Sequence, residues 1–162
     1  MSERNYQEYA KAGAGAYRAM YGLEVYLHQS GLEPSLLELV KMRTSQINGC
    51  AYCLDMHSKD ARARGETEQR LYVLQGWREA PFYNDRERAA LEWTEALTLI
   101  SQNHVPDEIF ERVSRVFTKK ELVDLTLAVV AINGWNRFAI SFRADVGSYQ
   151  PAGAQTKTAS GE

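Results

Sequence analysis

Apolar residues recur every three or four positions along almost the whole of this 162-residue chain. That spacing is typical of one face of an α-helix, whereas a half-buried strand alternates every second residue. We find no convincing two-residue alternation anywhere in the sequence. The clearest apolar stripes are Ala16, Met20, Leu23 and Leu27, then Ala89, Trp93, Ala96, Leu97 and Ile100, then Leu122, Leu125, Val129 and Ile132. The pattern predicts an all-α protein.

Glycine and proline mark where these helices begin and end. Gly31 ends one helix before Pro34, which suits the first turn of the next because its missing N–H has no helical partner there. The pair Asn48-Gly49 breaks the pattern again, so a new helix can start at or just before the following residue. Gly65 supplies a stop at the end of that helix.

Two capping boxes support the same division of the chain. Asn84 precedes Glu87 by three residues, and Thr118 precedes Glu121 by three. In a capping box the two side chains satisfy each other's free backbone N–H groups at a helix start. The second box introduces the longest apolar-faced helix of the chain.

The sequence predicts a single domain. No linker divides it, so residues 1–146 are expected to form a single domain of about seven helices, with residues 147–162 as a disordered tail rich in Gly, Ala, Ser and Thr. Tryptophan and leucine side chains on several short helices need burial, and a chain of this length offers a limited core. A homo-oligomer is therefore expected.

Composition argues against several classes of protein. Apolar residues make up 44% of the chain, charged residues 25%, and the net charge is −2 with both signs interspersed. No basic stripe points to nucleic acid and no polybasic run points to a membrane surface. The most apolar stretch, residues 125–132, is too short to span a bilayer, and the N-terminus lacks the apolar core of a signal peptide. The expected location is the cytoplasm.

The chain has two cysteines, Cys50 and Cys53, and they lie three residues apart. A disulfide between them closes almost no loop, so it adds little stability by restricting the unfolded chain. In a cytosolic protein a CxxC pair indicates redox chemistry or metal binding.

His57 follows Cys53 by one helical turn, so all three side chains share a face of one short helix. The imidazole there can take a thiol proton and leave a thiolate, the form that attacks peroxides and disulfides. If Cys50 sits at the helix N-terminus, the unpaired N–H groups and the helix dipole favour its thiolate. The dipole therefore favours Cys50 as the more acidic thiol, while the histidine spacing favours Cys53.

Glu38 lies one turn into the preceding predicted helix, twelve positions before Cys50. The Asn48-Gly49 turn can fold that helix back onto the cysteine helix, which brings Glu38 near His57. A carboxylate in this position orients an imidazole and raises its basicity. We therefore expect a contact between Glu38 and His57.

Together, Glu38, the CxxC pair and His57 resemble the signature of the alkylhydroperoxidase D and carboxymuconolactone decarboxylase superfamily. Flanking stretches at 36–43, 67–72 and 85–96 are also similar to members of this family, and the resemblance covers residues from about 20 to 145.

The resemblance implies an all-α fold, assembly into trimers or hexamers, and reduction of hydroperoxides. It implies Cys53 as the attacking thiolate, Cys50 as its disulfide partner, and His57 with Glu38 as a proton relay. An external dithiol, such as a lipoyl group or a small redox protein, then restores the cysteines, and no bound cofactor or metal is implied.

The chain departs from this family pattern in one residue of the motif. The best-studied alkylhydroperoxidase D has a second histidine between its cysteines, where this chain has Tyr52. Tyrosine is a poor base near neutral pH, so Tyr52 is expected to act as a wall residue. The decarboxylase branch typically lacks the cysteine pair, so decarboxylation is not expected.

Two other functions stay open at this level. Cys50, Cys53, His57 and Glu38 also make an acceptable ligand set for zinc. Alternatively, the pair acts as a redox-responsive switch in an oligomeric interaction protein with little turnover. Asn133 and Asn136, on the last helix, either close a pocket or hold a buried hydrogen-bond network.

Overall fold

The computed structural model of the protein describes residues 4–152, and within that range it is all-α. Its elements are nine α-helices and one short 3-10 helix: α1 (Tyr6–Ala12), α2 (Ala14–Gln29), α3 (Pro34–Asn48), α4 (Ala51–Ala63), α5 (Glu68–Tyr72), η1 (Leu74–Gly76), α6 (Asp85–Thr98), α7 (Ile100–Asn103), α8 (Asp107–Ser114) and α9 (Lys119–Phe142).

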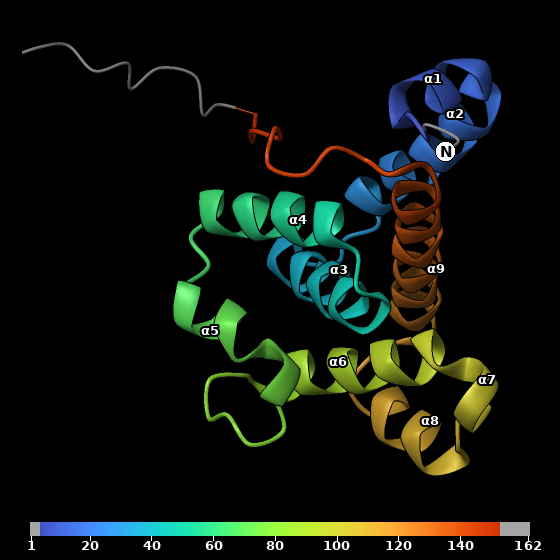
Figure 1. The fold of residues 1–162 in the computed structure, drawn as a ribbon. Helices are drawn as coiled ribbons and strands as arrows, with labels where there is room; N and C mark the ends of the chain where they lie inside the picture. Colours follow the sequence, from blue (N-terminus) through green and yellow to red (C-terminus); the bar gives the residue numbers. More distant parts are fainter. Residues whose placement is uncertain (1–3, 153–162) are drawn as a thin grey trace, which may run out of the picture.

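Helix α3 is the centre of the fold. It packs against α4, α6 and α9, and α2 runs along α9 (Figure 1). Nine of its fifteen residues are buried, including the polar residues Glu38, Lys41, Thr44 and Ser45. The largest apolar cluster joins α3 to α2, α6, α8 and α9, and contains Leu27, Leu36, Val40, Trp93, Val113, Leu125 and Val129.

The helix count is higher than the seven or so expected from the sequence. The added helices include α1 and α7, and residues 68–76 form two short elements, α5 and η1. Helix α1 buries none of its residues, so it leaves no apolar stripe in the sequence; the Asn5 side chain, which accepts from two of its N–H groups, starts it instead. Helix α7 has only four residues, a length at which periodicity carries no signal.

The predicted boundaries are confirmed. Both capping boxes are present, with each glutamate side chain accepting from the backbone N–H of its Asn84 or Thr118 partner. Gly49 and Gly65 follow α3 and α4 with φ of +68° and +94°. These left-handed conformations are open to glycine at little steric cost.

Helix α9 is long and apolar enough to cross a membrane by length and composition. Its apolar character therefore extends beyond the short stretch noted in the sequence. The core helix of a globular protein can have the same length and hydropathy. Helix α9 packs against α2, α3, α4, α6 and α8 through residues such as Leu125 and Ile132.

After α9 the chain turns back across α4 (Figure 1). Gly147 and Tyr149, inside the segment expected to be a tail, make hydrogen bonds to α4 side chains. Residues 153–162 of that segment lie outside the described residues.

The turn between α3 and α4 generates a stability prediction. Gly49→Ala should lower the free energy of unfolding by about 1–2 kcal/mol, because an L-residue is strained in the left-handed region. No atom lies within 4 Å of the added Cβ, so the cost is conformational. Gly22→Ala is the matched control: this site is exposed inside α2 with open space around it, and the same change there should stabilise by about 0.5–1 kcal/mol. Urea unfolding of both variants measures the two effects, and equal shifts would contradict the assignment of Gly49.

Candidate active site

The two cysteines lie where α3 ends and α4 begins. Gly49 closes α3, and the N–H of Cys50 donates to the carbonyl of Ser45 at 3.0 Å. Cys50 is the N-cap of α4 and Cys53 lies in its first turn. Both are free thiols and both are 1% exposed. The turn therefore buries the pair on one face of α4, as the spacing predicts.

The surroundings of the two sulfurs make Cys50 the more acidic thiol. The Cys53 thiol and the Cys53 backbone N–H both donate to the Cys50 sulfur, which lowers the pKa of Cys50 despite its burial. That same hydrogen bond, together with burial, raises the pKa of Cys53. Cys50 is therefore the sulfur of the pair that loses its proton more easily. The order agrees with the helix-dipole argument from the sequence.

A buried polar network supports the sulfurs from α9 and α3. The Asn136 amide lowers the pKa of both cysteines. It also donates to Ser45 Oγ at 3.1 Å, while Asn48 donates to the side-chain oxygens of Asn136 and Asn133 at 2.9 and 3.0 Å. Of the two roles left open for Asn133 and Asn136, the structure shows the buried network. Ser45 was not predicted as part of the site, and Asn48 was predicted only as part of the turn after the helix.

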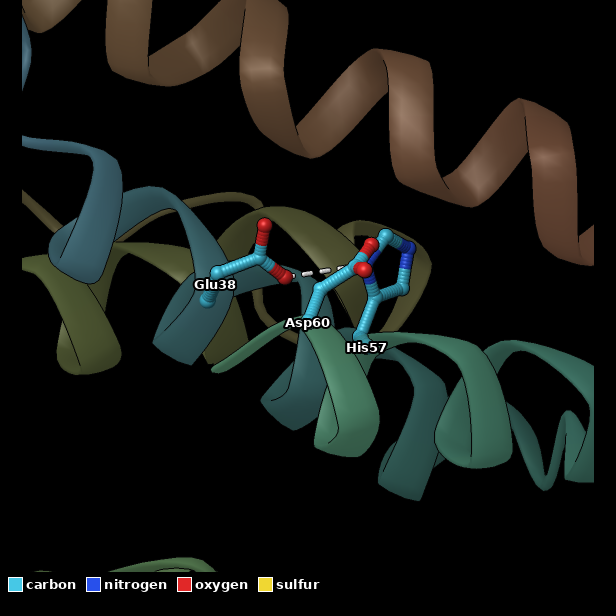
Figure 2. Close-up of side chains that lie close together, drawn as sticks. All are labelled: Glu38, His57 and Asp60. Atoms are coloured by element: carbon cyan, nitrogen blue, oxygen red, sulfur yellow. Dashed lines mark hydrogen bonds and ion pairs between the residues drawn. The ribbon is translucent and has the colours of Figure 1, made fainter. Parts of the chain in front are cut away.

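The expected contact between Glu38 and His57 is confirmed. His57 Nδ1–H donates to Glu38 Oε2 at 3.0 Å, and the two side chains point toward one another from α3 and α4 (Figure 2). Arg64 pairs with the other oxygen of Glu38. Because Nδ1 is engaged by the carboxylate, Nε2 is left as the nitrogen that can exchange a proton with another group.

Glu38 stays ionised although it is buried. Burial alone raises the pKa of Glu38, but the hydrogen bond from His57 and the positive charges of Lys41 and Arg64 outweigh it, so the pKa lies below its usual range. An ionised carboxylate on Nδ1 holds the ring in one orientation and fixes its tautomer.

A cavity of about 310 Å³ opens beside this relay. Its polar wall includes Glu38, His57 and Asp60, and its aromatic wall is formed by Tyr6, Tyr21, Tyr52 and Trp135. Cys50 and Cys53 pack against Tyr52, Trp135 and Ala139, which also line the cavity. The cavity therefore ends next to the sulfur pair.

Tyr52 is part of this wall. Its ring lies 6.1 Å from the ring of Tyr6, centroid to centroid, and burial raises the pKa of its hydroxyl. Tyr52 thus stays protonated and does not act as a base, in keeping with its expected role as a wall residue.

A second charged group closes the opposite side of the cavity. Lys41 donates to Glu24 Oε2 at 2.8 Å, and Trp135 Nε1 donates to Glu24 Oε1 at 3.1 Å. The side chains of α2, α3 and α9 are thereby tied together across the cavity.

The donor atoms that come together differ from the zinc set considered from the sequence. Among the described residues, a group able to hold a metal ion is formed by Glu38, His57 and Asp60, whose donor atoms lie within 4.8 Å of one another. The cysteine sulfurs are not members of this group. Glu38 pairs with Arg64, and Asp60 accepts from Tyr149, so both carboxylates already have partners.

Comparison with known proteins extends these findings. The profile described as the carboxymuconolactone decarboxylase family matches residues 12–96. The uncharacterized protein YdfG of Bacillus subtilis (strain 168) is 46% identical over 142 residues, which is 87% of this chain and 95% of that protein.

Solved structures share the fold. A protein of unknown function from Agrobacterium tumefaciens, described as a candidate antioxidant defence protein AhpD, is 44% identical with a TM-score of 0.83, covering 87% of this chain and 97% of that one. A peroxidase-related protein from Ralstonia eutropha JMP134, described as an alkylhydroperoxidase AhpD core, is 21% identical with a TM-score of 0.72, covering 84% and 74%.

The buried network generates a prediction for the thiols. Asn136→Ala should raise the pKa of Cys50, because a donor to its thiolate is lost, and should cost about 1–3 kcal/mol of stability by leaving buried groups unpaired. The pH profile of iodoacetamide alkylation measures the first effect and should move to higher pH.

Asn133→Ala is the matched control for this prediction. Asn133 also lies on α9 and also contacts Asn48. It is not among the groups that shift the pKa of Cys50 or Cys53. Its alkylation profile should match that of the wild type, and an unchanged profile for Asn136→Ala would contradict the role assigned to the amide.

Proposed function

The chain belongs to the carboxymuconolactone decarboxylase family and has the AhpD-like fold, and from this premise we propose that it is a thiol-dependent hydroperoxidase. One observation carries the proposal: a buried pair of free thiols, one of them acidified, lies one helical turn from a histidine held by an ionised carboxylate. That arrangement supplies a nucleophile, a resolving thiol and a proton relay.

Cys53 is proposed to attack the peroxide, because it lies one turn before His57 on α4. The proton shared by the pair first moves from Cys53 to Cys50 along their hydrogen bond. The Cys53 thiolate then attacks the terminal peroxide oxygen, the O–O bond breaks, and Cys53 becomes a sulfenic acid. The alkoxide that leaves takes the proton that is now on Cys50 and departs as an alcohol, which leaves Cys50 as a thiolate.

Cys50 closes the cycle as the resolving residue. Its thiolate attacks the Cys53 sulfur, the S–S bond forms, and hydroxide leaves with a proton delivered by His57, which regains it from solvent. Two thiols have then lost two electrons, and the hydroperoxide has become an alcohol and water. The acidity of Cys50 favours this step because the thiolate is the form that attacks. An external dithiol, such as a lipoyl group or a small redox protein, is proposed to reduce the disulfide.

We also propose that the protein works in the cytoplasm as a homo-oligomer, a trimer or hexamer. Support for self-association comes from large apolar side chains that α2 and α9 leave exposed, namely Tyr21, Val25, Tyr26, Val123, Val130 and Ile140. Such exposed apolar surface on a small domain marks a contact with another molecule.

The reaction generates the central prediction. One equivalent of cumene hydroperoxide should remove two thiols from the wild-type protein and form the Cys50–Cys53 disulfide, as measured by thiol titration and mass spectrometry. Cys53→Ser should abolish the reaction, and Cys50→Ser should stop it at a sulfenic acid that dimedone traps. His57→Ala should slow it by about 100-fold or more, which is the range of general acid–base catalysis.

Ser58→Ala is the control for the histidine variant. Ser58 follows His57 on α4, and its hydroxyl bonds to the helix carbonyl of Asp55. This variant should react at the wild-type rate. Thiols that stay unreactive in the wild type, or one zinc ion per purified chain, would overturn the peroxidase proposal. An unchanged rate in His57→Ala would show that His57 does not act as a proton relay in the reaction.

A further inference from the structure

The segment after α9 is fastened to the outer side of the helix that carries the site. Gly147 N–H donates to Asp55 at 3.2 Å, and Lys59 donates to the carbonyls of Gly147 and Tyr149 at 3.3 and 3.0 Å. Gly147 has a φ of +99°, which turns the chain toward α4. The contacts place Tyr149 at a fixed point along this helix.

The Tyr149 side chain reaches the group of charges beside the relay. Its hydroxyl donates to Asp60 Oδ1 at 2.7 Å. Burial, the contact with Asp60 and the nearby charge of Glu38 raise the pKa of Tyr149, so the hydroxyl keeps its proton and remains a donor at physiological pH. Asp60 in turn lies one turn after His57 on α4.

His57 consequently has two carboxylates within reach. The donor atoms of Glu38, His57 and Asp60 lie within 4.8 Å of one another, and Figure 2 shows Asp60 beside the imidazole. The single N–H on Nδ1 is donated to Glu38. The Nδ1–H can serve one carboxylate well at a time, so one acceptor must be preferred for the ring to keep a single orientation.

We propose that Tyr149 is a positioning residue that occupies Asp60 and so leaves Glu38 as the acceptor for His57. The two carboxylates are held differently: Arg64 fixes the free oxygen of Glu38, and Tyr149 takes an oxygen of Asp60. The C-terminal segment therefore takes part in setting the geometry of the relay from 89 residues away. The consequence for catalysis rests on the proposed function, but the preference for Glu38 does not.

The test measures the tautomer and hydrogen bonding of His57 directly, in reduced protein without peroxide. Nitrogen-15 NMR of the wild type should show His57 in one tautomer, with the Nδ1 proton shifted downfield by its hydrogen bond to Glu38. In Tyr149→Phe this signal should broaden or move, because a freed Asp60 competes for the same proton. The rate of thiol oxidation by hydroperoxide should fall about 3- to 10-fold.

Asp60→Asn supplies the rescue. An amide oxygen is a weaker acceptor than a carboxylate, so Tyr149→Phe introduced on top of Asp60→Asn should change neither the His57 signal nor the rate. A Tyr149 that only anchors the segment would give the same loss with and without the Asp60 change.

Tyr26→Phe is the matched control. Tyr26 also donates its hydroxyl to a carboxylate, Asp124, at 2.8 Å, but this contact joins α2 to α9 and does not involve α4. It should leave the His57 signal unchanged.

The outcomes separate the two proposals. If the His57 signal moves in Tyr149→Phe and is restored by Asp60→Asn, positioning holds even when the wild type reduces no peroxide. If the wild type reduces peroxide but Tyr149→Phe leaves the signal and rate as they were, positioning is wrong and the peroxidase stands.

Discussion

Most of the polar side chains that α3 carries into the protein find a partner from another element, and among the described residues of this helix the buried Thr44 hydroxyl is the exception. The helix is enclosed by α4, α6 and α9, so its charged and amide groups cannot turn to water, and an unpaired group there is costly. The partners come from four directions: Glu24 on α2 for Lys41, His57 on α4 for Glu38, Glu95 on α6 for Arg43, and Asn136 on α9 for Ser45. The candidate site is built from these pairings, because three of the four line the cavity or hold the sulfurs.

The sulfur pair shows how burial and hydrogen bonding compete at such a site. Burial alone disfavours a thiolate, yet donors from Cys53 and Asn136 outweigh it at Cys50. The same logic keeps Glu38 ionised beside His57. In both cases hydrogen-bond donors favour the charged form of a buried group over its neutral form. Local donors of this kind lower the pKa of a thiol and so make it more reactive.

Much of the site followed from the sequence because its parts lie close together along the chain. The break at Asn48-Gly49 predicted that α3 folds onto α4, and the family resemblance singled out Glu38 as the carboxylate that would contact His57. Helices with caps and apolar stripes were also predictable, whereas α1 has no buried face and α7 is too short to show a period. The helix count was therefore too low.

What the sequence did not indicate depends on contacts between distant segments. Tyr149 and Asp60 are 89 positions apart, and Asn136 and Ser45 are 91 apart. No periodicity or motif links such residues, because their meeting is decided by how whole helices pack. A tyrosine in a polar segment rich in small residues carries no signal of a contact with a buried relay. The choice between pocket and network for Asn136 likewise required the packing of α9 on α3.

The Asn136 amide also links the oxidation state of the protein to its stability. In the dithiol form the amide lowers the pKa of both thiols and so stabilises a thiolate there. A neutral disulfide is a weaker acceptor, and a CxxC bridge closes too short a loop to compensate by restricting the unfolded chain. By the thermodynamic cycle that joins folding to oxidation, the native fold then favours the dithiol more strongly than the unfolded chain does. The fold accordingly makes a Cys50–Cys53 disulfide easier to reduce than the same bridge in the unfolded chain.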